Sequence, residues 1–100
     1  MSLELFSELN SQISKDTLDE ILLELQAKYQ KAYVSESGGY GFVRHGENYQ
    51  IKEPPLFDIF ILNDKVALSV YGDLNDQKKI KEQVSNIFLK KNIPVDFVEE

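Results

Sequence analysis

Apolar residues follow a helical period in the first third of the chain. Six of them recur at i, i+3, i+4, i+7, i+11 and i+14, a spacing that places them on one face of a helix. These residues are Leu18, Ile21, Leu22, Leu25, Tyr29 and Ala32. Asp16 or Thr17 can cap the start of this helix. Apolar residues at positions 5, 6, 9 and 13 predict a shorter helix before it, with a break around residues 10–11.

From Tyr33 onward the apolar period changes to two, which is typical of β-strands. The short strands expected from this pattern are 33–36, 40–44 and 48–53. A turn at 45–47 joins the last two of them. Pro54-Pro55 ends the series, because proline cannot donate a ladder hydrogen bond.

The strongest strand signal lies between residues 56 and 71. If Asn63-Asp64 is a two-residue hairpin loop, six apolar residues pair across the two strands and share one sheet face. The pairs are Ile61–Val66, Ile59–Leu68 and Phe57–Val70. The opposite face, which includes Asp58, Phe60 and Tyr71, is also largely apolar. Because a half-solvated hairpin alternates more cleanly, this one is expected at the centre of the sheet or beneath a covering element.

A second helix is predicted before a last strand. Asp73 or Asn75 can cap this helix, and Pro94 prevents its continuation into the strand expected at 95–98. Its apolar stripe consists of Ile80, Val84, Ile87 and Phe88.

The order of these elements predicts an α+β fold. We expect a mostly antiparallel sheet of about five to six strands, with a long N-terminal helix and a second helix before the last strand. The alternative for the last strand is parallel pairing with the strand before the second helix, through a right-handed crossover. The helices can lie on one side of the sheet or on both, and only the first arrangement leaves the face of Phe60 and Tyr71 open.

Length and composition narrow the class of protein. The chain has 100 residues, which predicts a single domain over 1–100. It has no cysteine, which excludes disulfides and thiolate metal sites. The longest apolar run is Ile59–Leu62, far short of the ~18 residues of a membrane span. The first residues lack the positive region of a secretory signal, so we expect a cytoplasmic protein.

The charge balance favours a basic protein partner. The chain has 17 Asp and Glu against 11 Lys and Arg, a net charge of −6, and a single arginine. Such a chain repels phosphate backbones, so we expect no direct binding to nucleic acid. The same charge attracts a basic surface. Residues 1–30 contain six acids and two lysines, and 2 − 6 gives −4, so most of the net charge lies there.

Acidic residues dominate the predicted outer face of the main helix. This face holds Asp16, Asp19, Glu20 and Leu23, with Glu24 at its margin. An apolar anchor within a field of carboxylates suits a basic protein surface. The alternatives are a solvated helix face and Leu23 packed under the preceding short helix.

Asp58 is a second candidate for partner contact. It lies in an apolar strand opposite Ser69, either as a polar anchor that faces a partner or as a carboxylate satisfied locally by Ser69 or at a sheet edge. Phe60 and Tyr71 belong to the same sheet face. The candidate partner-binding residues are therefore Asp16, Asp19, Glu20, Leu23, Glu24, Asp58, Phe60 and Tyr71.

The sequence contains little that indicates catalysis. His45, the only histidine, lies beside Arg44 and Glu47, but no nucleophile or orienting partner accompanies it, so a polar turn is favoured over an acid–base site. The Gly38–Gly41 segment lacks the Gly-Lys-Ser/Thr ending of a phosphate loop and is interpreted as a turn between strands, with Gly41 allowing a bulge or a close backbone approach. No metal site and no cofactor are expected, and the chain is not expected to be an enzyme.

The overall layout resembles that of a group of bacterial proteins. A helix from Asp16 to Tyr33, followed by strands from Phe57 to Tyr71, is similar to the immunity proteins of polymorphic-toxin and contact-dependent growth-inhibition systems. The resemblance implies a cytoplasmic protein that binds and neutralises one cognate toxin domain, often a nuclease, as a monomer or weak dimer. These families share no signature motif, so no residue role is carried over. The alternatives are an acidic secretion-type chaperone, which would dimerise, or another protein-binding module, and a small-ligand enzyme near Gly38–Glu47.

Overall fold

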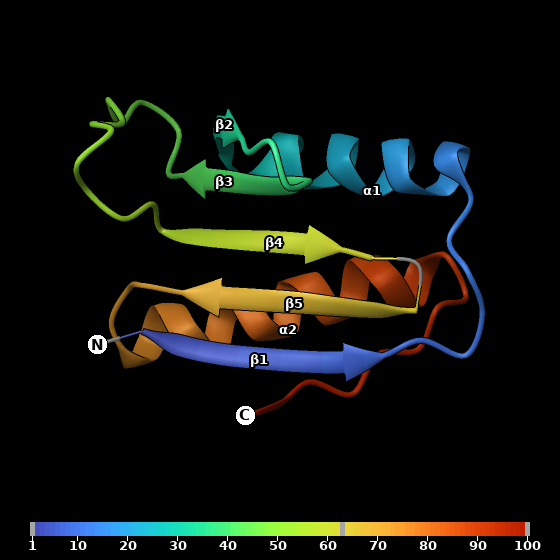
Figure 1. Cartoon of the computed structure of the whole chain (residues 1–100). Coiled ribbons are helices and arrows are strands. Elements are labelled where there is room, and N and C mark those ends of the chain that lie inside the picture. The colour runs from blue at the N-terminus through green and yellow to red at the C-terminus, as the bar shows by residue number, and fades with distance from the viewer. Residues whose placement is uncertain (1, 63, 100) are drawn as a thin grey trace.

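The fold is a six-stranded antiparallel sheet with two helices (Figure 1). The computed structural model describes residues 2–62 and 64–99. Its elements are β1 (Leu3–Glu8), α1 (Lys15–Lys28), β2 (Gln30–Val34), β3 (Gly39–Val43), β4 (Phe57–Ile61), β5 (Lys65–Val70), α2 (Leu74–Lys90) and β6 (Val98–Glu99). The strand order is β2-β3-β4-β5-β1-β6, and every neighbouring pair is antiparallel. The predicted α+β class and the antiparallel sheet are confirmed.

The central hairpin has the predicted register. Strands β4 and β5 occupy the two middle positions of the sheet. The three predicted apolar pairs, Ile61–Val66, Ile59–Leu68 and Phe57–Val70, face each other. The Leu62 N–H donates to the Lys65 carbonyl at 2.8 Å and closes the hairpin end. Asn63, part of the predicted loop, lies outside the described residues.

The prediction of an N-terminal helix is wrong, because a strand precedes α1. Residues 3–8 form β1, in which Leu5 faces Leu68 and Phe6 faces Ala67 of β5. Leu5 is fully buried whereas its neighbour Glu4 is exposed, so the segment has a period of two. Leucines four residues apart fit a helix equally well, and pairing with a distant strand decides the outcome.

Helix α1 starts and ends differently from the prediction. Ser14 is the N-cap, and its hydroxyl accepts the Thr17 N–H at 3.2 Å, so neither Asp16 nor Thr17 has this role. The helix ends at Lys28, since Tyr29 has an extended backbone while its N–H still bonds to the Leu25 carbonyl. The chain then enters β2, which includes Ala32, so the predicted helical face is one turn too long.

Two further strand predictions are corrected. Residues 48–53 form no strand, because β3 pairs directly with β4 and leaves them no ladder to join; they belong to a loop over residues 44–56. The final strand is only Val98–Glu99, and it pairs antiparallel with β1 rather than parallel with β5. By contrast, the predicted second helix is confirmed, with Asp73 as its N-cap and a capping box formed with Asp76.

Both helices pack on one side of the sheet (Figure 1). The core between the layers joins Ile21 and Leu25 of α1 to the buried stripe of α2. The helix-facing strand residues in this core are Leu5, Phe42, Phe57, Ile59, Val66, Leu68 and Val70. Because strand side chains alternate, Asp58 and Phe60 point to the other side. No helix covers that side among the described elements, and we call it the open face.

Candidate functional site

Two rows of side chains cross the open face at right angles to the strands. The antiparallel register places them opposite one another from strand to strand. The first, the carboxylate row, consists of Glu4, Ser69, Asp58, Gly41 and Tyr33. The second, the phenylalanine row, consists of Phe6, Ala67, Phe60 and Gly39, with Val98 beside Phe6. The open face therefore combines an acidic row with an apolar row.

Asp58 is held between two tyrosines. The Tyr71 hydroxyl donates to Oδ2 of Asp58 at 3.0 Å, and the Tyr33 hydroxyl approaches the same oxygen at 3.5 Å. The residue is only 8% exposed. Burial raises the pKa of the Asp58 carboxyl, the hydrogen bonds from the two tyrosines oppose that rise, and the charge of Glu4 adds to it. The carboxylate is thus a desolvated group at the centre of an otherwise open surface.

The two tyrosines respond to the same environment. Burial, followed by the charge of Asp58, raises the pKa of Tyr33 to about 12. The same two causes raise the pKa of Tyr71. Both hydroxyls therefore stay protonated and act as donors to Asp58 near neutral pH.

Two glycines make room for the aromatic rings on this face. A Cβ atom on Gly41 would lie 2.3 Å from the ring of Tyr33, and one on Gly39 would lie 2.4 Å from the ring of Phe60. The rings rest directly on the backbone of β3, which fixes their position beside Asp58. The close approach predicted at Gly41 is therefore made by the Tyr33 ring.

The 44–56 loop extends the open face beyond Tyr33. A pocket of about 510 Å³ is lined by Ala32, Tyr33, Tyr49 and Ile51. The Tyr33 and Tyr49 rings lie with their centroids 5.4 Å apart, and Ile51 is 89% exposed. An apolar surface therefore adjoins the buried carboxylate.

The acidic face of α1 is partly neutralised. Leu23 is 65% exposed and is not packed under a preceding helix, since that segment is a strand. Glu24 forms ion pairs with Lys90 and Lys91 of α2, both at 3.6 Å, and Glu20 pairs with Lys91 at 3.4 Å. The lysines of the α2 C-terminus thus offset part of the charge of this face.

The candidate partner-binding residues fall into two groups. Asp58, Phe60 and Tyr71 lie together on the open face. The other five, Asp16, Asp19, Glu20, Leu23 and Glu24, belong to α1, in the helical layer on the other side of the sheet. A standard protein interface buries about 800 Å² on each partner. Because the two groups lie on opposite sides of the sheet, one interface of this size covers one group and not both.

Sequence reasoning missed two members of the carboxylate row. The sequence pattern predicts a helix at Glu4, which conceals the alignment of Glu4 with Asp58 through Ser69. The pattern predicts a strand at Tyr33, but the position of Tyr33 beside Asp58 depends on the register of three strands and on an irregularity between Lys31 and Tyr33. A period-two pattern at residues 3–8 was the available signal for Glu4.

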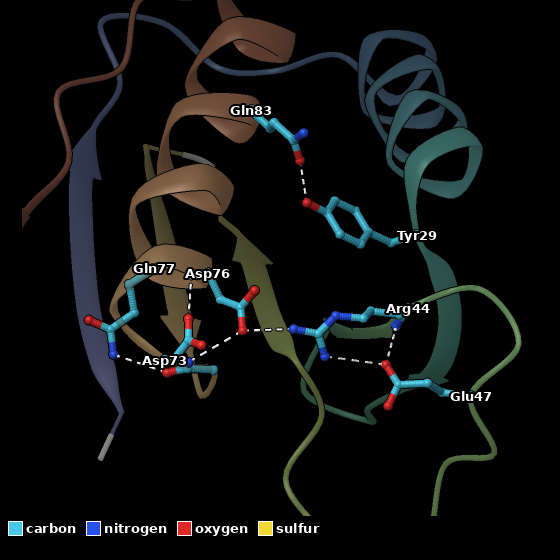
Figure 2. A network of polar contacts seen from close by, with 8 residues as sticks. Tyr29, Arg44, Glu47, Asp73, Asp76, Gln77 and Gln83 are labelled. Atoms are coloured by element: carbon cyan, nitrogen blue, oxygen red, sulfur yellow. Dashed lines mark hydrogen bonds and ion pairs between the residues drawn. The ribbon is translucent and has the colours of Figure 1, made fainter.

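The polar network near His45 links a loop to a helix (Figure 2). Nη2 of Arg44 pairs with Oδ2 of Asp76 at 2.7 Å, and Glu47 contacts both the guanidinium and the backbone N–H of Arg44. In the same region the Tyr29 hydroxyl donates to Oε1 of Gln83. His45 is exposed and, within the part of the chain that the structure describes, makes no hydrogen bond or ion pair. The Glu47 N–H donates to the Arg44 carbonyl at 3.1 Å, which forms the predicted turn.

Within residues 2–62 and 64–99, no three histidine, aspartate or glutamate residues group in a way that could hold a metal ion. None of the helices described is long and apolar enough to cross a membrane. Comparison with protein-family models, with curated proteins and with solved structures found no significant match to this chain.

Proposed function

We propose that this protein is a cytoplasmic inhibitor of the immunity-protein type, which binds a basic toxin domain and neutralises it. The observation that carries the proposal is the open face, where the desolvated carboxylate of Asp58 lies among half-buried aromatic residues. Aromatic residues are enriched in protein interfaces, and an anchor at the centre of such a surface contributes most of the binding free energy.

Charge supports a basic partner. The open face carries Glu4, Glu8 and Asp58 against Lys65, which faces Glu8 directly. The whole chain has a net charge of −6, which accelerates encounter with a positive surface. A nuclease binds nucleic acid through a basic surface, so an acidic protein that covers this surface competes with the phosphate backbone. Inhibition of this kind needs no catalytic group in the inhibitor.

The acidic face of α1 has a secondary role in this proposal. Asp16 and Asp19 are exposed, and they add to the long-range field that guides the partner. Glu20 and Glu24 contribute less, because Lys90 and Lys91 lie against them. We therefore expect α1 to affect the rate of association and the open face to affect the lifetime of the complex.

The test pairs the purified protein with a basic toxin domain, chosen from the genes that neighbour its own. Calorimetry at low and high salt measures affinity, and a toxin activity assay measures neutralisation. We expect a one-to-one complex, loss of toxin activity and weaker binding at high salt. Asp19→Lys should slow association at low salt only, whereas Glu4→Lys on the open face should also speed dissociation.

The rival class, a secretion-type chaperone, makes a different prediction. Such a protein forms an obligate dimer, and pairing through the open face would bring the Asp58 carboxylates of two copies together. Light scattering that shows a stable dimer, together with no effect on the toxin, would overturn the inhibitor proposal.

A further inference from the structure

The open face of β5 is flanked by larger side chains on both sides. Ser69 and Ala67, which we call the β5 strip, are small and half-buried. Ser69 lies between Glu4 of β1 and Asp58 of β4. Ala67 lies in the same way between Phe6 and Phe60. The surroundings of the β5 strip therefore change from apolar at Ala67 to acidic at Ser69, and these two residues are about 7 Å apart along the strand.

We propose that the β5 strip receives one arginine side chain of the protein partner, a proposal that rests on the inhibitor function above. The aliphatic stem lies over Ala67 between the two phenylalanine rings, and the guanidinium lies over Ser69 between Glu4 and Asp58.

The chemistry of the flanking residues matches that of arginine. An arginine side chain buries its methylene stem on apolar surface while its charged end stays among polar groups. The planar guanidinium stacks on aromatic rings and has five donors, which suits two carboxylates on opposite sides. Strand spacing separates the backbones of β1 and β4, which flank β5, by about 10 Å. The two acids share one row with no lysine or arginine in it.

Asp58 retains capacity for a further donor. A carboxylate accepts about four hydrogen bonds, and here Tyr71, Tyr33 and Ser69 supply three. The Tyr33 hydroxyl lies 3.5 Å from Oδ2 of Asp58, against 3.0 Å for the Tyr71 hydroxyl, so the Tyr33 contact yields to a guanidinium more readily than the Tyr71 contact does. The arriving cation offsets the desolvation of the carboxylate, and the charge-assisted bonds it forms are stronger than those of a neutral donor.

The first experiment uses small probes in place of the partner. Backbone amide shifts are recorded by NMR during titration with N-acetylarginine amide, N-acetyllysine amide and N-acetylcitrulline amide, the last being a neutral analogue of arginine. We expect the arginine probe to shift the amides of Ser69, Ala67 and Glu4, the lysine probe to bind more weakly, and the citrulline probe to give no shift there. Equal shifts with lysine, or shifts elsewhere on the protein, would overturn the assignment to arginine at this strip.

Variants of the full chain locate the site. Asp58→Asn and Glu4→Gln each remove one charged acceptor and should weaken binding of the arginine probe about tenfold or more. Ala67→Leu places a larger side chain between the two phenylalanines and should block the stem without a change of charge. Glu82→Gln removes an equal charge from an exposed position of α2 and should leave binding unchanged. Undiminished binding in folded Glu4→Gln and Ala67→Leu proteins would contradict the proposal even if Asp58→Asn fails to fold.

Binding measurements with the toxin domain distinguish failure of the arginine site from failure of the proposed function. With the toxin, Asp58→Asn should reduce affinity ~10–100-fold while Glu82→Gln, at an exposed position of α2, changes it little. If the toxin binds Asp58→Asn and Ala67→Leu as tightly as the wild type, the arginine site is wrong and the inhibitor function stands. If the arginine probe binds the strip but the toxin does not bind at all, the proposed function is wrong and the arginine site stands.

Discussion

Arg44 and Asp76 form a 2.7 Å ion pair that ties the 44–56 loop to the first turn of α2 (Figure 2). The same carboxylate of Asp76 accepts the Asp73 N–H at 3.3 Å, and Asp73 accepts the Asp76 N–H at 2.9 Å, which completes the capping box. Asp76 therefore stabilises both the N-terminus of α2 and the 44–56 loop. The other partner of Arg44 is Glu47, and we expect α2 to depend on Asp76 more than on Glu47.

Asp76→Ala should lower the free energy of unfolding by about 1–2 kcal/mol, because it removes half of the capping box and the ion pair. The cap contributes most of this loss, since the Arg44 side chain is half exposed and the ion pair is screened by solvent. Urea denaturation measures the change. Glu47→Ala, which removes only the 3.5 Å contact with the guanidinium and a loop hydrogen bond, is the matched control and should cost less. An equal loss in both variants would contradict the role given to the cap.

Gly41→Ala should move the Tyr33 ring off β3. The new Cβ would lie 2.3 Å from the ring, which is too close for the ring to stay beside Asp58. The pKa of Tyr33 should then fall from about 12 toward its ordinary value of 10.0, as burial and the contact with Asp58 are lost. Alkaline titration, followed by the ultraviolet absorbance of tyrosinate, measures this change.

Gly39→Ala is the matched control for that titration, because its Cβ meets Phe60 rather than Tyr33. It should leave the pKa of Tyr33 high. A Gly41→Ala protein that titrates like the wild type would show that the Tyr33 ring does not need this glycine. The folded-state pKa of Tyr33 exceeds the ordinary value, so its contribution to stability is complete below about pH 10 and is lost toward about pH 12.

Phe88→Ala should lower the free energy of unfolding by about 3–5 kcal/mol. The ring is fully buried where α2 meets the sheet, and its removal leaves a cavity in the core. The adjacent Leu89 is 60% exposed, so Leu89→Ala should change stability by less than about 0.5 kcal/mol. Chemical denaturation of the two variants compares a buried and an exposed position on one helix. Similar losses would contradict the packing of α2 described above.

Residues close together along the chain allowed the sequence to predict the middle of the fold. Ile59 and Leu68 alternate in a short hairpin, so their pairing follows from a loop of two residues. The buried stripe of α2, which includes Val84, follows from the helical period and a clear N-cap. In both cases the neighbours that define the element lie within about twenty residues of each other, and local patterns contain enough information.

Distant pairing explains what the sequence did not predict. Leu5 fits a helical or a strand pattern, and its partner Leu68 lies 63 residues further along the chain. The same error hid Glu4 from the candidate site, although Asp58, Phe60 and Tyr71 were identified on one face. The open face itself depends on which side both helices take, and that choice is made by packing rather than by the pattern of any one segment.

Asp58→Asn tests the balance of burial and hydrogen bonding at the centre of the open face. Burial is the largest cause acting on the Asp58 carboxyl, and it raises the pKa in the folded state above the ordinary value of 3.8. The folded protein therefore binds this proton more tightly than the unfolded chain does. The corresponding stability is fully present below pH 3.8 and is lost as the pH rises through the folded-state pKa.

The asparagine variant does not titrate at this position, so the difference between the two proteins isolates Asp58. Going from about pH 7 to about pH 3, the free energy of unfolding of the wild type should rise relative to that of Asp58→Asn. Urea denaturation across this range measures the difference. If the wild type instead loses stability relative to Asp58→Asn on acidification, the hydrogen bonds from Tyr71 and Tyr33 outweigh burial. The carboxylate would then already be satisfied within the protein, and the attraction for a partner's cation would lose its main physical basis.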